Sequence, residues 1–212
     1  RQRQMCIRDS IWVDVNGDYV IDEKDRVVAA NARPKVTGGF YFNLSYKEFS
    51  MHVNTSFVFG RDIINTVLAR TFESYSNPVK KKISDLRKNA ALAPIERYNF
   101  WTENNRYNAK YPNPYDYIHN DIIDPFREEQ TLFVEDGSYF KLNTVSLSYR
   151  FPKEWLSFFR VSGVTLKASV NNIWTFSKYS GISPESVTGL GRDNSGGYPN
   201  ARTWTVGVVL NL

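Results

Sequence analysis

The chain has 212 residues, a formal net charge of +5 and a single cysteine, Cys6. This length suffices for one domain with a full core, or for part of a larger protein. One cysteine excludes an internal disulfide framework and a cysteine-based zinc site. The basic residues are scattered apart from a run at 80–82, so no nucleic-acid partner is predicted.

The first ten residues, "RQRQMCIRDS", have neither an apolar stretch nor a periodic pattern. They do not read as a signal peptide, and they do not lead naturally into the residues after them. We therefore interpret 1–10 as a non-native leader and reason about the fold from 11–212.

The next segment, "DVNGDYVIDEKD" at 14–25, has oxygen-bearing residues at the spacing of an EF-hand or dockerin calcium loop. Two positions depart from that pattern: Tyr19 replaces the usual glycine, and an aspartate replaces the closing glutamate. The alternative is a turn in which Asp and Asn side chains cap their own backbone. Calcium is thus a candidate accessory ion, and no cofactor is required. The candidate ligands are Asp14, Asn16, Asp18, Val20 through its carbonyl, Asp22 and Asp25.

Five later segments alternate apolar and polar residues with a period of two, which predicts β-strands. Each is ~10–12 residues long, more than the ~5–6 of typical globular strands and enough to cross a bilayer at a tilt. In the third segment the alternation changes phase, which predicts a bulge near Asn143. The predicted strands are 36–47, 49–60, 139–151, 163–174 and 203–212.

The connections between these strands are short and long in alternation. Segments 61–138 and 175–202 are long, whereas the first two strands are joined by a few residues. Outer-membrane barrels have short periplasmic turns and long outer loops, so we predict that 11–35 and both long connections lie outside. The first long connection is also expected to hold helical pieces at 63–75 and 79–92. A soluble β-sandwich, whose strands also alternate, is the alternative.

Under this arrangement the aromatic residues form two bands, as amphipathic rings do at the headgroup level of a membrane. The band predicted at the periplasmic interface contains Tyr46, Phe49, Tyr149, Phe151 and Trp155. The band predicted at the outer interface contains Phe40, Phe59, Tyr139, Trp174 and Trp204.

The chain ends in "TVGVVLNL", a final strand with polar, glycine and apolar residues at set positions. This pattern resembles the C-terminal signal that the barrel-assembly machinery reads by strand addition at an exposed edge. The usual last residue is Phe, and this chain has Leu instead. The matching residues are Thr205, Gly207, Leu210 and Leu212.

Five blocks together resemble the C-terminal end of the SusC/RagA family of TonB-linked outer-membrane transporters of Bacteroidetes. They occur in family order and span nearly all of the chain from Asp14 onward. The blocks are "DVNGDYVIDEKDRV", "GGFYFNLSYKEFSM", "FVEDGSYFKLNTVSLSYRFP", "VNNIWTFSKYSGISPE" and "GGYPNARTWTVGVVLNL".

The resemblance implies an all-β fold: the last ~5 antiparallel strands of a large transmembrane barrel of the 22-strand type, in the outer membrane. It also implies TonB-driven import of glycans or peptides together with a SusD-like surface lipoprotein. The plug, the TonB-contacting segment and the signal peptide would lie upstream. The partners it implies are the lipoprotein, TonB, the barrel-assembly machinery and outer-membrane lipid.

No constellation typical of an enzyme is present: paired acids such as Glu128 and Glu129 lack a partner base, and no nucleophile motif occurs. We therefore predict a transport protein that is not an enzyme. The alternative from another class is a secreted β-sandwich binding module with a dockerin-like calcium turn. The two differ in a simple respect, since a barrel segment must expose a continuous apolar belt and would not be stable as a soluble monomer.

Overall fold

The computed structural model describes residues 13–20, 22–76, 98–113, 126, 128–156, 161–193 and 200–211. The predicted leader, the predicted helix at 79–92 and Leu212 lie outside these residues. The strands are β1 (Val36–Gly38), β2 (Tyr41–Tyr46), β3 (Phe49–Phe59), β4 (Asp62–Ile64), β5 (Val134–Asp136), β6 (Tyr139–Arg150), β7 (Gly163–Ser177) and β8 (Thr203–Asn211). The helices are α1 (Thr66–Ser76) and α4 (Lys153–Leu156), with single 3-10 turns at Glu23–Asp25 and Thr131–Phe133.

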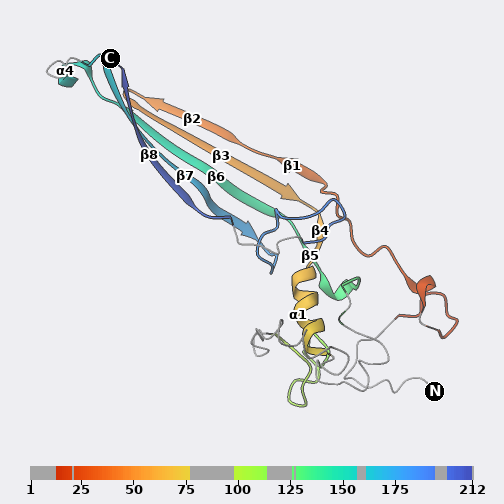
Figure 1. Ribbon diagram of the computed structural model, residues 1–212. Helices are drawn as coiled ribbons and strands as arrows, with labels where there is room; N and C mark the ends of the chain where they lie inside the picture. The colour runs from red at the N-terminus through yellow and green to blue at the C-terminus, as the bar shows by residue number, and fades with distance from the viewer. Residues whose placement is uncertain are drawn as a thin grey trace. The chain divides into compact units, whose positions relative to one another are not determined.

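Six of the strands form one antiparallel sheet in the spatial order β1-β3-β6-β7-β8, with β2 also paired to β3 (Figure 1). β1 and β2 together occupy the single predicted strand 36–47, and the chain departs from regular pairing at Gly39 and Phe40 between them. A β-carbon on Gly39 would come within 2.5 Å of the Thr55 carbonyl oxygen, so the backbones approach closely there. If β1 and β2 are counted as one strand, the strands of this sheet lie side by side in their order along the chain, as in a meander.

All of the short connections lie at one end of this sheet, as do α4 and the end of β8 (Figure 1). Lys47 and Glu48 form the turn between β2 and β3, and 151–162 joins β6 to β7. The long connections, 60–138 and 178–202, leave from the opposite end. This is the arrangement that the alternation of connection lengths predicts.

The predicted bulge is confirmed. Asn54 of β3 pairs with Thr144 while Thr55 pairs with Leu142, so Asn143 is the extra residue in β6. The shift continues into β7, where Leu142 pairs with Trp174 and Thr144 with Asn171. Asn172, within this stretch of β7, has the left-handed φ of 55° that asparagine tolerates better than most residues.

The chain divides into two compact units, one of 31–63 with 135–212 and one of 1–30 with 64–134. The first holds the large sheet. The second holds α1 and a small core of its own, in which Leu68, Ala69 and Phe72 are buried. α1 begins where Asn65 accepts a hydrogen bond from the Leu68 N–H through its side-chain oxygen at 3.0 Å, a normal N-cap.

The sandwich alternative does not fit this architecture, because a sandwich buries one face of each sheet against the other. In the described residues the second sheet consists only of β4 and β5, three residues each. The large sheet leaves apolar side chains exposed on every one of its strands. No helix in the described part of the chain is both long and apolar enough to span a membrane.

Candidate functional site

The large sheet has one apolar and one polar face, and the bulge at Asn143 keeps the two separate. Beyond the bulge, Phe140 and Leu142 share a face with Val145 and Leu147, although their numbers differ in parity. In register with them lie Phe42, Leu44, Met51, Val53 and Phe57 on β2 and β3, Leu166, Ala168, Val170 and Phe176 on β7, and Val206, Val208 and Leu210 on β8.

At the short-connection end, the predicted aromatic band is gathered on the apolar face. Tyr46 pairs with Phe49, which pairs with Tyr149, and the Phe49 and Tyr149 ring centroids are 4.8 Å apart. Phe151 follows at 5.1 Å from Tyr149, and Trp155 of α4 lies 6.4 Å from Phe151. The rings thus form a continuous row across three strands and the following turn.

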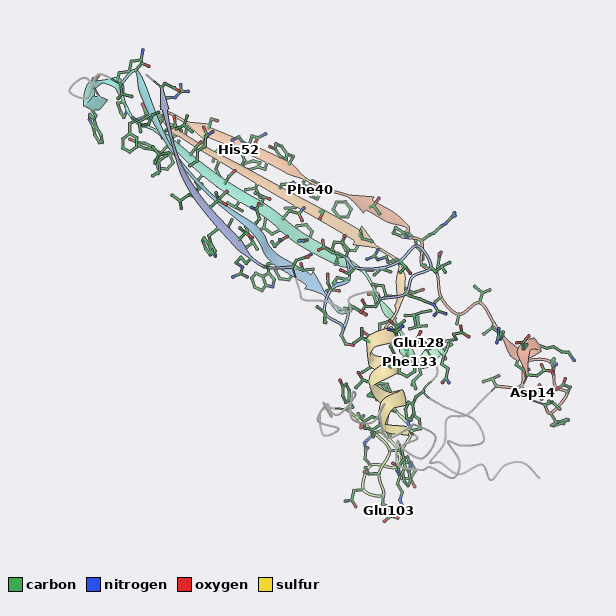
Figure 2. All side chains as sticks on the ribbon, viewed as in Figure 1. Asp14, Phe40, His52, Glu103, Glu128 and Phe133 are labelled. Atoms are coloured by element: carbon green, nitrogen blue, oxygen red, sulfur yellow. The ribbon has the colours of Figure 1, made fainter. Side chains whose placement is uncertain are left out.

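At the opposite end, most of the second predicted band also lies on the apolar face. Figure 2 labels Phe40 of this band. Phe40 contacts Phe57, which stacks on Phe59, at centroid distances of 5.5 and 5.4 Å. Trp174 stacks on Phe176 at 4.5 Å. The predicted band does not contain Phe57 or Phe176. Phe57 lies inside its predicted strand and not at the strand end, and Phe176 lies just past the predicted end of its strand.

Two members of the second band are placed differently from one another. Trp204 pairs with Val170 on the apolar face and is 72% exposed. Tyr139 instead pairs with Val58 and Ser177 on the polar face, where Arg61 lies over its ring at 5.6 Å. The structure therefore does not bring Tyr139 to the face of the other aromatic residues. Its assignment to the band rested on its place at the end of the strand, and the bulge at Asn143 turns its side chain to the polar face.

The separation of the two aromatic rows fits a membrane. Phe49 and Phe59 begin and end β3 and share its apolar face. Ten steps of about 3.4 Å give about 34 Å of strand, which at a tilt of about 40° spans about 26 Å of height. The apolar band of outer-membrane barrels is about 25 Å tall.

The polar face is lined by hydroxyls, amides and a few bases. One row across the sheet runs through Asn43, His52, Ser146, Ser169 and Thr205, with His52 hydrogen-bonded to Asn43 (Figure 2). No acidic residue occurs within the six strands, all of which the structure describes. Such a surface suits water and hydrogen-bonding solutes.

The connection after β7 folds as a compact loop, 179–193, whose neck is closed by polar contacts. The buried Tyr179 hydroxyl donates a hydrogen bond to the buried Asp193 carboxylate. Burial, and then this carboxylate, raises the pKa of the tyrosine above its ordinary value. Ser180 donates to Glu135 through its hydroxyl and its N–H at 2.7 and 2.8 Å.

The middle of this loop is held by two bases. Arg61 donates to the Pro184 carbonyl, and its Nε donates to the Gly137 carbonyl at 3.3 Å. Lys141 of β6 pairs with Glu185 at 2.7 Å. Lys141 lies on the polar face, so loop 179–193 is attached to that face. No sequence pattern indicates this ion pair, because its partners are 44 residues apart.

The aromatic residues of 98–113 mainly pack on their own loop. Around Phe72, the rings of Tyr98, Phe100 and Tyr111 lie at centroid distances of 4.8–4.9 Å. Phe126 and Phe133 complete the cluster at 5.6 and 6.0 Å. Tyr107, by contrast, is 88% exposed.

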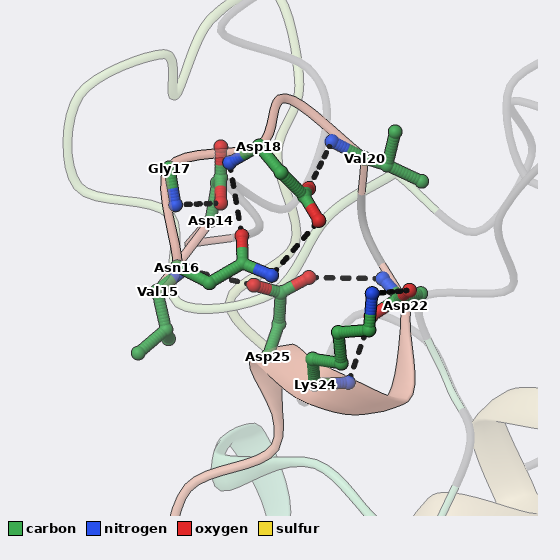
Figure 3. Close-up of polar contacts among 9 residues, drawn as sticks. All are labelled: Asp14, Val15, Asn16, Gly17, Asp18, Val20, Asp22, Lys24 and Asp25. Carbon is green, nitrogen blue, oxygen red and sulfur yellow. Dashed lines mark hydrogen bonds and ion pairs between the residues drawn. The ribbon is translucent and has the colours of Figure 1, made fainter.

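The segment at 14–25 turns much as a calcium loop does, in spite of its missing glycine (Figure 3). Gly17 and Tyr19 both have left-handed φ angles, of 78° and 63°. Tyr19 therefore adopts the conformation for which glycine is usually needed. The Asp14 carboxylate accepts the N–H groups of Gly17 and Tyr19 at 2.7 and 2.8 Å, which compensates for this conformation.

The other oxygen-bearing side chains of the loop also accept backbone hydrogen bonds, the behaviour expected of the capped-turn alternative (Figure 3). Asp18 accepts from the Val20 N–H at 2.8 Å, and Asp22 from Lys24 at 2.7 Å. Asp25 accepts from Asp22 and Val15, both at 2.9 Å, and these bonds lower its pKa.

In the described part of the chain, no three or more His, Cys, Asp or Glu side chains are grouped so that they could hold a metal ion. Amide and carbonyl oxygens, such as those of Asn16 and Val20, also bind calcium. Calcium binding by this loop stays a prediction.

The predicted assembly-signal residues lie on β8, an edge strand of the sheet. Leu210 faces the apolar side opposite Val164, whereas Thr205 and Gly207 face the polar side opposite Ser169 and Lys167. The outer backbone edge of β8 has no paired strand in the described residues, as a signal read by strand addition would require.

Comparison with known proteins gives a consistent result. No protein-family model matches the chain. TonB-dependent receptor P3 of Formosa agariphila is 29% identical over 214 residues, covering 95% of this chain and 19% of the receptor. TonB-dependent receptor SusC of Bacteroides thetaiotaomicron is 24% identical over 205 residues, covering 96% of this chain and 18% of SusC.

The fold is also found in solved structures. A chain of the RagAB peptide transporter matches with a TM-score of 0.62 and 22% identity, over 90% of this chain and 19% of that one. The RagAB peptide importer in its open-open state matches with a TM-score of 0.57 and 21% identity, over 85% and 17%.

The chain thus spans about a fifth of the length of the curated relatives it matches. Over nearly all of its own length it is similar to them in sequence, and its fold matches part of a chain of the RagAB transporter. The resemblance predicted from the sequence is confirmed: this chain is similar in sequence and in fold to the SusC/RagA type of TonB-dependent outer-membrane receptor.

Proposed function

We propose that this chain is a barrel segment of a TonB-dependent outer-membrane transporter that imports glycans or peptides together with a SusD-like surface lipoprotein. The observation that carries the proposal is the continuous apolar face of the large sheet, exposed on every strand and bordered by aromatic rows. An exposed face of this extent needs lipid against it.

The two faces then have different tasks. The apolar face contacts outer-membrane lipid, and the polar face, with its hydroxyls and amides, borders the passage for the solute. The edges at β8 and at β1 and β2 continue into further strands of a closed barrel, which the assembly machinery inserts. Loop 179–193 leaves the sheet at the end of the long connections, which is the outer side in this proposal, where a lipoprotein would dock.

RagAB is described as a peptide importer, and the curated relatives as TonB-dependent receptors. These names support transport rather than catalysis as the role of the whole protein. TonB would act through the part of the receptor that lies outside this chain, since the resemblance implies a plug upstream.

The test is a growth experiment with the gene of the full-length receptor. Three strains are compared: the parent, a strain lacking the receptor gene and a strain lacking TonB. Each is grown on one carbon source at a time, either a peptide mixture or a purified glycan. We expect both deletions to abolish growth on the same substrate and to leave growth on glucose unchanged. Equal growth of the receptor deletion and the parent on every substrate would contradict the proposal.

A matched pair of variants links the growth phenotype to this chain. Val145→Lys places a charge on the apolar face, whereas Ser146→Lys places the same charge on the polar face. Outer-membrane fractions should contain less receptor for the first variant and a normal amount for the second.

A further inference from the structure

Lys141 is an unusual residue of the polar face because it is buried and the sheet offers it no counter-ion. Its side chain projects between Ser56 and Thr175 of the flanking strands, and the residue is only 6% exposed. None of the six strands contains an acidic residue. A buried ammonium group without an anion is strongly unfavourable, so the anion has to come from outside the sheet.

Loop 179–193 supplies that anion. A carboxylate oxygen of Glu185 lies 2.7 Å from the Lys141 ammonium nitrogen, and the same oxygen accepts a hydrogen bond from the Asn200 amide at 3.1 Å. The lysine side chain is 8% exposed and that of the glutamate 22%. Solvent, or a solute, therefore reaches the ion pair from the side of Glu185.

The neck of the loop does not depend on this ion pair. Tyr179 bonds to Asp193, and Ser180 bonds to Glu135 of β5. These contacts hold both ends of the loop whether or not Glu185 stays on Lys141. Arg61 also keeps its contact with the Pro184 carbonyl. Release of Glu185 therefore loosens only the part of the loop between Pro184 and the neck, as compact loops with closed ends allow.

We propose that Lys141 is a carboxylate-binding site on the polar face, and that Glu185 occupies it as an internal stand-in which a solute carboxylate displaces. This proposal rests on the proposed function, because it takes the polar face as the border of the solute passage. The ligand class is a small organic carboxylate, such as a peptide C-terminus or a uronic acid. A neutral solute cannot displace Glu185, because it would leave the buried ammonium without a counter-ion.

The test uses the purified full-length receptor in detergent. The probes are N-acetyl-trialanine and its C-terminal amide, and glucuronate and glucose, so that each carboxylate has a neutral counterpart and the two sources are compared. Calorimetry measures binding. A spin label at Leu190→Cys, an exposed position of the loop, reports loop mobility in a background free of other cysteines.

We expect one or both carboxylates to bind and to increase the mobility of the label, and neither neutral counterpart to do so. Glu185→Gln removes the competing charge while keeping the side-chain volume, and should strengthen carboxylate binding at least about fivefold. Lys141→Met should abolish binding. Lys167→Met, at an exposed lysine of the same face, is the matched control and should leave binding unchanged.

Three results would overturn the proposal: equal binding of the amide, carboxylate binding that survives Lys141→Met, or an unchanged affinity in Glu185→Gln. Folding of Glu185→Gln is checked by the difference in gel mobility between heated and unheated receptor. If this variant does not fold, Glu185→Asp replaces it and should strengthen carboxylate binding by a smaller factor. If the receptor binds no carboxylate while the parent strain grows normally on the imported substrate, this site alone is refuted. If the receptor binds carboxylates but the deletion strain has no growth defect, the transport role alone is refuted.

Discussion

Phe72 in α1 is fully buried among five other aromatic rings, whereas Trp204 and Val206 on β8 are 72% and 73% exposed. The unit of 1–30 with 64–134, here the loop unit, thus buries the rings around Phe72 within itself. The unit of 31–63 with 135–212, the sheet unit, leaves the apolar residues of its strands exposed. Apolar side chains are stabilised when they are removed from water. The rings around Phe72 are removed from water by other residues of this chain, whereas the apolar face of the sheet needs a partner outside it. The two units should therefore respond differently to mutations and to the removal of lipid.

The largest effect is expected from Phe72→Ala, because it removes the ring at the centre of the loop cluster. Large-to-small changes of this kind cost about 3–5 kcal/mol. Hydrogen exchange of the full-length receptor should show lost protection of backbone amides in 64–76 and 98–113, with the sheet unchanged. Tyr107→Ala, at an exposed ring of the same unit, is the control and should change neither. Equal protection in Phe72→Ala would show that the cluster does not hold this unit together.

Val145→Lys should follow, with a loss of about 2–4 kcal/mol in lipid vesicles, because it places a charge at the middle of the apolar face. Ser146→Lys on the opposite face should cost less than about 1 kcal/mol. Urea unfolding of the receptor in vesicles, followed by tryptophan fluorescence, measures both. Similar losses for the two variants would mean that lipid does not cover the face of Val145.

Asn65→Ala sharpens the comparison within the loop unit, since it removes the N-cap of α1 and leaves the aromatic cluster intact. Loss of a cap costs about 1 kcal/mol. We expect faster amide exchange in the first turn of α1 and unchanged exchange near Phe100. Asn65→Asp retains an acceptor at this position and should restore the protection.

The smallest effect concerns acid. Hydrogen bonds from the Asp22 and Val15 N–H groups lower the folded pKa of Asp25 below its ordinary value of 3.8. A lowered pKa means that the folded loop binds its proton less readily than the unfolded chain does. The stabilisation is present above pH 3.8 and is lost as the pH falls through the folded pKa.

Amide exchange of Val15 and Asp22, normalised for the intrinsic effect of pH, measures this loss. Asp25→Asn should make the protection of these amides independent of pH in the acid range. Protection in the parent chain that does not change down to about pH 2 would contradict the assigned role of Asp25.

The sheet and its connections follow from short-range patterns, which is why they can be predicted from the sequence. Alternation of side chains locates the strands within three residues, and the phase change at Asn143 identifies the bulge. Tyr139 shows where position along the strand alone is insufficient, because the bulge at Asn143 turns its side chain away from the face of the other band residues.

The contacts of the candidate carboxylate site could not be predicted in this way. Lys141 and Glu185 lie in different elements, and neither has a neighbouring residue that signals its partner. The packing of Tyr98, Phe100 and Tyr111 on Phe72 could not be predicted either, because these rings also lie in a different element from their partner. An aromatic-rich segment indicates burial or binding, and only the folded loop decides which rings are used for which.

The bulge in β6 also sets a limit on how this chain can change in length. Deleting Asn143 would carry Lys141 to the apolar face and Phe140 and Leu142 to the polar face, together with Tyr139 at the start of the strand. Deleting one residue there would disturb the strand as much as several simultaneous substitutions. Deleting one residue at an exposed loop tip, such as that of Tyr107, would move no strand side chain to the other face. Length variation among relatives should therefore be concentrated in the loops and be absent from this point in the strand.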